Sequence, residues 1–109
     1  MAALMAPETD PWAFDYSLIP DETIATFRRY FEHGIPPGSF CVAVLCNDLS
    51  GAVLRADQFN ARAIGAIVCW LYNNAPAGSW GSEENYFSWI RRVYGHKLIN
   101  GLLNVVGAA

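Results

Sequence analysis

Charged side chains are scarce in this sequence: Asp, Glu, Lys and Arg make up 16% of its 109 residues, against about 25% in a typical globular protein. Hydrophobic residues make up 53%. A chain this apolar can bury enough surface to fold, which excludes disorder for most of its length, and its size fits one domain. Because few ionic groups are left to cover the outside, we expect some apolar surface to be hidden between copies in a homo-oligomer.

An excess of positive charge is also missing. The formal net charge is −3, whereas domains that bind duplex nucleic acid are strongly basic, so we expect no duplex nucleic acid as a partner. The sequence has no run of 18 apolar residues of the kind a membrane-spanning helix needs. The first residues, MAALMAPETDPWAF, lack the basic start of a secretory signal. These absences predict a cytoplasmic protein that does not contact a membrane.

The sequence has few residues that could form a metal or cofactor site. The cysteines are odd in number, show no Cys-x-x-Cys spacing and lie in apolar runs, at positions 41, 46 and 69. This pattern is typical of small core residues in a reducing compartment. The two histidines, His33 and His96, are far apart and lack ligand spacing. Since a glycine-rich phosphate loop is missing as well, we expect no metal, no cofactor and no enzyme activity.

Charge and apolar spacing predict helices along most of the chain. Asp21 and Glu22 at one end and His33 at the other match the dipole of a helix, and Gly34 is suited to end it in a left-handed conformation. The predicted buried stripe of this helix is Ile24, Phe27 and Phe31. Further helices are predicted over 52–56, 58–74 and 82–95, the last of them capped by Ser82 and ended by Gly95.

The apolar run 40–46 fits a buried strand or a buried helix equally well. A strand needs a partner strand, and the apolar spacing elsewhere is helical, so we expect a central helix capped by Ser39. The predicted fold is therefore all-α, a compact bundle of four to five helices with an irregular N-terminal arm. Its predicted parts are the arm 1–19, a helical domain 20–95 and an amphipathic C-terminal tail 96–109.

The tail has helical amphipathicity with one charged residue, Lys97. Helices that lie on membranes usually carry several lysines or arginines, so we favour packing against another subunit over membrane contact. The positions that exceed the needs of a small bundle, and that we predict as the oligomer interface, are Leu98, Ile99, Leu102 and Leu103.

Several segments between Gly34 and Ile90 form a recognisable series: GIPPGSF at 34–40, AVLCNDL at 43–49, the Ala-Asp-x-x-Asn unit at 56–60, WLYNNAP at 70–76 and WGSEENYFSWI at 80–90. In this order they resemble a family of short phage and prophage proteins. The resemblance implies a helical fold and a phage setting, with the host cytoplasm as the location. Since the family has no assigned activity, it implies no functional residues.

Polar residues gather around the turn that joins two apolar segments, and they are Asn47, Asp48, Asp57 and Asn60. They predict either a small polar pocket, with Arg55 or Arg62 available for an anion, or helix capping, and we favour capping. Trp80, in a glycine-flanked loop, could stack on a base, although a tryptophan that packs the loop onto the core is the favoured interpretation. The residues that we retain as candidate ligand or partner contacts are Asn47, Asp48, Arg55, Asp57, Asn60 and Trp80.

These features favour a non-enzymatic phage or prophage accessory protein that acts by binding. Two modes are open: it blocks a host defence protein, such as a CRISPR component, or it sequesters a small nucleotide signal. The alternatives are a small hydrolytic enzyme that uses Asp48 and Asp57 as an acid/base pair and a structural oligomerisation module. Binding of DNA through the apolar helices is disfavoured, because such helices are ill suited to a groove.

Overall fold

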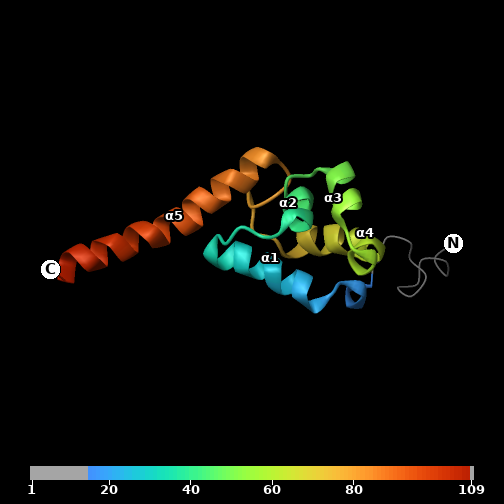
Figure 1. Ribbon diagram of the computed structural model, residues 1–109, viewed down its shortest axis with the longest axis horizontal. Coiled ribbons are helices and arrows are strands. Elements are labelled where there is room, and N and C mark those ends of the chain that lie inside the picture. Colours follow the sequence, from blue (N-terminus) through green and yellow to red (C-terminus); the bar gives the residue numbers. More distant parts are fainter. Residues whose placement is uncertain (1–14, 109) are drawn as a thin grey trace.

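The computed structural model describes the backbone of residues 15–108 and the side chains of residues 15–95. Over this part the chain forms a 3-10 turn and five α-helices and contains no strand (Figure 1). The elements are η2 Tyr16–Leu18, α1 Asp21–His33, α2 Ser39–Leu45, α3 Leu49–Arg55, α4 Gln58–Asn74 and α5 Glu83–Ala108. The predicted all-α fold is confirmed. Residues 1–14 of the predicted arm lie outside the described residues.

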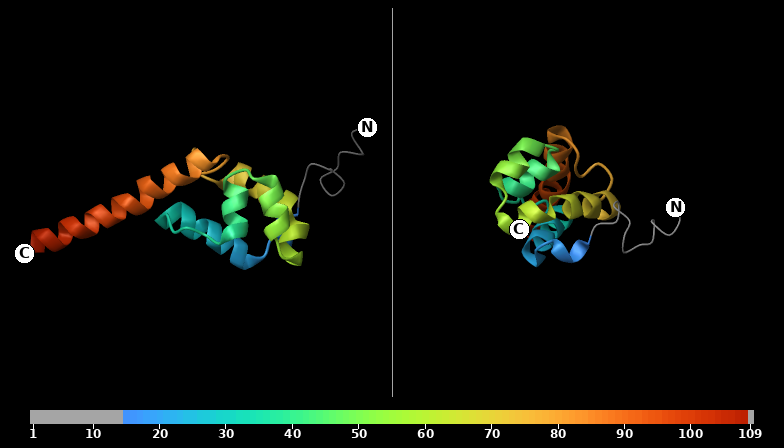
Figure 2. Two further views of the ribbon diagram at one scale, coloured as in Figure 1. Left: turned by 45° about the horizontal axis from the view of Figure 1, so that its top comes forward. Right: turned by 90° about the vertical axis from the view of Figure 1, so that its right-hand side faces the viewer.

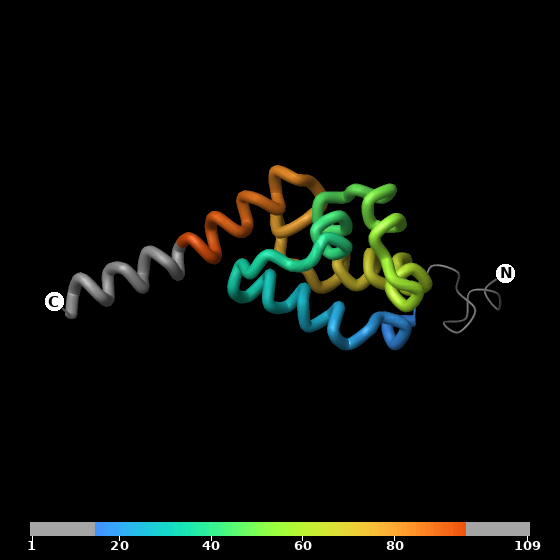
Figure 3. Tube along the Cα trace, viewed as in Figure 1, coloured from blue at the N-terminus to red at the C-terminus, as the bar shows by residue number. Residues whose placement is uncertain are grey.

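The short helix α2 is the central element of the globule. It contacts α1, α3 and α5, and the tube trace shows these neighbours grouped around it (Figures 2 and 3). Four of its seven residues are buried, namely Cys41, Ala43, Val44 and Leu45. The predicted choice of helix over strand for this run is confirmed.

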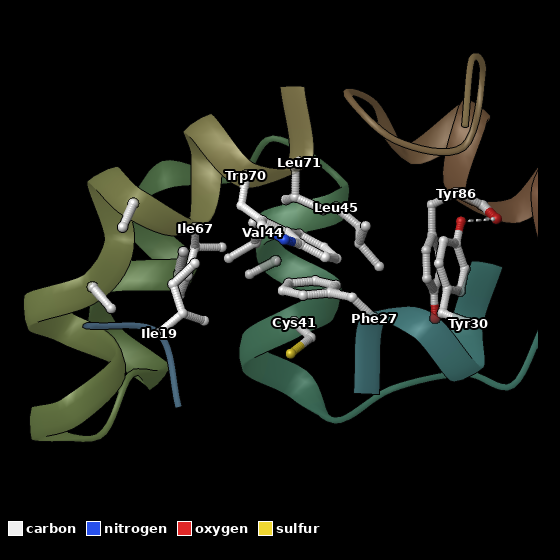
Figure 4. Packing of buried hydrophobic residues seen from close by; sticks show 14 of the residues in the cluster. Ile19, Phe27, Tyr30, Cys41, Val44, Leu45, Ile67, Trp70, Leu71 and Tyr86 are labelled. Atoms are coloured by element: carbon white, nitrogen blue, oxygen red, sulfur yellow. Dashed lines mark hydrogen bonds between the residues drawn. The ribbon is translucent and has the colours of Figure 1, made fainter. Parts of the chain in front are cut away.

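Aromatic side chains tie α1 to the C-terminal half of the chain. Phe27 lies against Trp70 of α4, with ring centroids 6.1 Å apart, and Tyr30 stacks on Tyr86 of α5 at 5.5 Å (Figure 4). Tyr30 is fully buried, yet it lies outside the predicted stripe, of which Ile24 and Phe31 are only half-buried. The aromatic core is thus broader than the spacing predicted, because helices pack on α1 from more than one side.

The starts of α2 and α3 differ from the prediction. The N-cap of α2 is Gly38 rather than Ser39, which is the first residue of the helix. The third helix begins at Leu49, three residues before its predicted start at position 52, because the Asp48 side chain accepts a hydrogen bond from the Gly51 amide and so caps the helix earlier.

Helix α4 has the predicted bounds, but it is not buried all round. Tyr72 is 81% exposed and Val68 is 42% exposed, while the opposite side of the helix, which includes Ala63, Ile67 and Trp70, is buried. One side of this helix is therefore left uncovered by the described residues.

Gly95 does not end the last helix. Ser82 caps α5 as predicted, through a hydrogen bond from the Asn85 amide to its hydroxyl at 3.0 Å, but the helix then continues through Gly95 to Ala108. A glycine inside a helix costs only about 1 kcal/mol, and it ends the helix when it turns left-handed, as Gly34 does with φ of 66°. The predicted boundary between 95 and 96 falls inside one continuous helix.

Candidate functional site

The corner between α2 and α3 is shaped by Asn47. Its φ is 61°, the only positive φ among the described residues other than glycine, and its amide donates to the Val44 carbonyl at 3.1 Å. The next amide, of Asp48, reaches back to the Ala43 carbonyl at 2.8 Å. This pair of bonds is a Schellman motif, in which asparagine replaces the usual glycine. Asn47 therefore ends α2 and turns the chain into α3.

Asp48 begins α3 and lies beside Arg55. The carboxylate accepts a hydrogen bond from the Gly51 amide at 3.0 Å. A Cβ atom added to Gly51 would collide with that carboxylate and would lie 2.5 Å from the Arg55 guanidinium. Both charged groups thus lie over the backbone of Gly51, which leaves room for them because it has no side chain.

A groove of about 620 Å³ opens between α2, α3 and the start of α5. We call it the polar groove, because Asp48, Glu83 and Arg55 bring charge to its wall. Its lining residues are Pro37, Ser39, Val42, Ala43, Cys46, Asn47, Asp48, Arg55, Glu83 and Phe87. Two carboxylates against one guanidinium give this groove an acidic character.

The thiol in the polar groove is held in its protonated form. Burial raises the pKa of Cys46, and the nearby carboxylates of Glu83 and Asp48 raise this pKa further. The thiolate is the nucleophilic form of cysteine, so this shift lowers the share of Cys46 in the nucleophilic form at neutral pH. All three cysteines are free. Cys41 is buried, in line with the predicted core role, whereas Cys46 and Cys69 are only half-buried and Cys46 lines the polar groove.

A smaller hollow of about 110 Å³ lies between α2, α3 and α4, on the other side of the same corner. We call it the apolar groove. It is lined by Ala43, Val44, Asn47, Asp48, Leu49, Ala52, Ile64, Val68 and Trp80. Trp80 is half-buried against the core, and its loop is fixed by a bond from the Gly81 amide to the Leu45 carbonyl at 2.8 Å. Trp80 thus forms a wall of the groove instead of standing free in its loop.

Two of the predicted site residues lie elsewhere. Asp57 caps α4, where its carboxylate accepts from the Asn60 amide at 2.7 Å, and the Asn60 side chain accepts from the Thr23 hydroxyl at 2.7 Å. Neither Asp57 nor Asn60 lines the two grooves. The structure therefore places Asn47 and Asp48 at both grooves, Arg55 at the polar groove and Trp80 at the apolar groove. Asp57 has the role that the capping interpretation predicts, whereas the Asn60 side chain joins α4 to Thr23 of α1, which that interpretation did not predict.

Sequence reasoning missed the outer surface of α3. This helix buries its small residues, Gly51 and Ala52, and exposes its large ones: Leu49 is 70% exposed, Val53 53% and Leu54 83%. The sequence did contain a signal for this arrangement. The small residues at positions 51 and 52 mark the side of the helix that another element can approach closely. We call Leu49, Val53 and Leu54 the α3 face.

The predicted oligomer interface lies outside the described side chains. Leu98, Ile99, Leu102 and Leu103 belong to α5, of which the structure describes the backbone alone beyond Gly95.

Among the described residues, no three His, Cys, Asp or Glu side chains come together as metal ligands, and no helix has the length and apolar character to cross a bilayer. No protein family model, no curated protein and no solved structure matches the chain. The resemblance to phage proteins therefore stays a prediction.

Proposed function

We propose that this protein is a non-enzymatic binding protein whose α3 face contacts another protein. The observation that supports this is the inverted burial of α3, in which the small residues face inward and three large apolar side chains are exposed. Exposed apolar side chains that gather on one surface are a common feature of protein interaction sites. Because the patch lies on a helix fixed by an aspartate cap, it is a preformed surface.

The two grooves extend this surface on either side of the α2–α3 corner. Asn47 and Asp48 line both of them, and Leu49 of the α3 face lines the apolar groove. Protein interfaces commonly combine an apolar centre with a polar rim. A partner protein that places apolar side chains on α3 and a basic side chain in the polar groove would match this arrangement.

A nucleotide fits the polar groove less well. Among the described residues that line this groove, Arg55 is the one cation, against the carboxylates of Asp48 and Glu83, and phosphates need an excess of positive charge or free backbone amides. The Gly51 amide at the start of α3 already donates to Asp48. Of the two binding modes, blocking a protein is therefore favoured over sequestering a nucleotide signal.

The enzyme alternative receives less support. Its acid/base pair requires Asp48 and Asp57 to act on one ligand, but the two carboxylates cap different helices, and Asp57 lines neither groove. The chain's resemblance to phage proteins supports a host defence protein, such as a CRISPR component, as the partner in the host cytoplasm.

The proposal is tested with a matched pair of variants. Leu54→Glu places a charge on the α3 face. Leu18→Glu places the same charge on η2, where the Leu18 side chain is 53% exposed. The η2 turn packs on α4 and lies away from α3 (Figures 1 and 2). Tagged wild-type protein and both variants are used to capture proteins from host cells. We expect one host protein to bind the wild type and Leu18→Glu and to be lost with Leu54→Glu.

Two results would overturn the proposal. One is a capture in which no protein binds the wild type above background. The other is a set of bound proteins that is the same for both variants, since the α3 face would then be irrelevant to binding.

A further inference from the structure

Helix α4 carries an apolar strip that the described residues leave wholly or partly exposed. Tyr72 is 81% exposed and Val68 is 42% exposed. Steps of three and four residues back along the helix lead from these two side chains to Gly65 and Ala61, and residues at this spacing lie on one side of a helix. None of the four is charged. We call them the α4 strip.

The α4 strip lies between the apolar groove and η2. The groove is lined by Ile64 and Val68 on one edge of the strip. On the other edge η2 packs on α4 (Figure 1), and the Tyr16 hydroxyl accepts from the Asn73 side chain at 3.1 Å and donates to the Cys69 carbonyl at 3.5 Å. Cys69 and Asn73 each directly follow a residue of the strip, which is a step of about 100° around the helix. The η2 turn therefore borders the strip.

The described part of the chain begins at this border. Asp15 caps η2, where its carboxylate accepts from the Ser17 amide at 2.9 Å. The 14 residues that precede it can extend over about 45 Å, whereas the strip from 61 to 72 is about 16 Å long. The segment 1–14 is therefore attached beside the strip and is long enough to reach all of it.

We infer that the segment 1–14 packs on the α4 strip through Trp12 and Phe14. These are the two aromatic residues of the segment, and they stand directly ahead of Asp15 in the sequence. Attachment at Asp15 gives the segment a high effective concentration at the strip. The contact also avoids the loss of translational and rotational freedom that a separate partner would incur.

The shape of the strip suits large rings. Gly65 and Ala61 leave the helix backbone open to close approach, while Val68 and Tyr72 offer apolar area on which an aromatic side chain can pack. Because Val68 also lines the apolar groove, the segment packed here would extend the wall of that groove.

The test is hydroxyl-radical footprinting of the full chain, with the oxidation rate of each side chain read by mass spectrometry. We expect Tyr72 to be oxidised severalfold more slowly in the wild type than in Trp12→Ala/Phe14→Ala, because the rings that cover it are then missing. Glu8→Ala/Thr9→Ala is the matched control, which changes the same segment but keeps its aromatic rings, and it should give the wild-type rate. Tyr94, which is 48% exposed on α5, should be oxidised equally in all three proteins.

A reciprocal pair of variants leaves the segment intact. Tyr72→Asp places a charge in the strip and should raise the oxidation rate of Trp12 severalfold. Leu54→Asp places the same charge on α3, outside the lining of the apolar groove, and should leave the rate of Trp12 unchanged. The two replaced side chains are 81% and 83% exposed, so both variants should fold.

Two results would overturn the inference. One is a Tyr72 rate that is the same in the wild type and in Trp12→Ala/Phe14→Ala. The other is protection of Tyr72 that appears only as the protein concentration rises, since a contact within one chain is independent of concentration and the strip would then be covered by a second copy. Neither readout requires a host protein, so a failure here is distinguishable from a failure of the proposed function.

Discussion

Tyr30 joins three parts of the molecule through one side chain. Its hydroxyl donates to the Ser79 carbonyl at 2.8 Å and lies 3.2 Å from the Tyr86 carbonyl, while its own carbonyl accepts from the Trp89 indole at 3.1 Å. Ser79 is fully buried in the loop before α5. This tyrosine therefore fixes the loop that carries Trp80 and, with it, one wall of the apolar groove.

Removing the hydroxyl should destabilise the fold. Tyr30→Phe keeps the ring stack but leaves the buried Ser79 carbonyl without this donor, which we expect to lower the free energy of unfolding by about 1–2 kcal/mol. The free energy of unfolding is measured by urea denaturation, with tryptophan fluorescence as the signal. Tyr72→Phe, which removes the hydroxyl of a residue that is 81% exposed, is the control and should change the stability by less than about 0.5 kcal/mol. Equal effects would contradict the role of Tyr30.

The buried thiol of Cys41 makes stability depend on alkaline pH. Burial raises the pKa of Cys41 to about 11, whereas an unfolded thiol ionises near 8.5. Between these values the unfolded chain loses a proton that the folded chain keeps, so the free energy of unfolding falls as the pH rises. We expect a loss of about 2 kcal/mol through this thiol at the upper end of the range.

The measurement is urea unfolding at pH 8 and at pH 10.5, for the wild type and for Cys41→Ala. Tyr30 and Tyr86 also have raised pKa values, because both are buried, but they are present in both proteins and their contribution cancels. The wild type should lose more stability than Cys41→Ala over this interval. The same loss in both proteins would exclude Cys41 as a source of the pH dependence.

At the scale of the element, two glycines have opposite effects on the helices that contain or precede them. The backbone of Gly34 is left-handed and ends α1, whereas Gly95 has a helical backbone and lies inside α5. The sequence predicted a helix end at both, because each follows an amphipathic stretch, although only Gly34 is followed by prolines, at positions 36 and 37. What distinguishes them is the φ angle that the surrounding structure imposes.

Alanine substitution tests this difference. Gly95→Ala should raise the free energy of unfolding by about 0.5–1 kcal/mol, because alanine is the better helix former and a Cβ there meets nothing within 4 Å. Gly78→Ala is the comparison: Gly78 has the same open space but φ of 77°, so alanine should destabilise by about 1 kcal/mol. Thermal and urea unfolding report both values. A destabilised Gly95→Ala would show that the helix stops at this residue.

Helix α3 shows why the candidate site was only partly predictable. Its polar boundary residues, Asn47 and Asp48, follow from the turn and capping chemistry of a single segment, and the sequence predicted them. Which of its apolar residues face the core depends on α2, against which α3 packs, and the residues of α3 that are buried are Gly51 and Ala52. Tertiary packing thus exposed the larger side chains, against the usual preference for burying them.

At the scale of the whole molecule, the helices were predictable and their assembly was not. The bounds of α1 and α4 follow from caps and apolar spacing, which act within one segment. The polar groove also needs Glu83 and Phe87, which come from the far end of the chain, and no local pattern places them beside Asp48. The scarcity of charge indicated an interface, and the structure places exposed apolar side chains on α3.

The most direct measurement is the affinity of the captured host protein for this chain, determined by titration calorimetry with the wild type, Leu54→Glu and Leu18→Glu. Large apolar contacts at the centre of an interface contribute more than about 1 kcal/mol each. We therefore expect Leu54→Glu to weaken Kd by at least about tenfold, and Leu18→Glu to leave it within about twofold. Equal Kd values for the two variants would contradict binding through the α3 face.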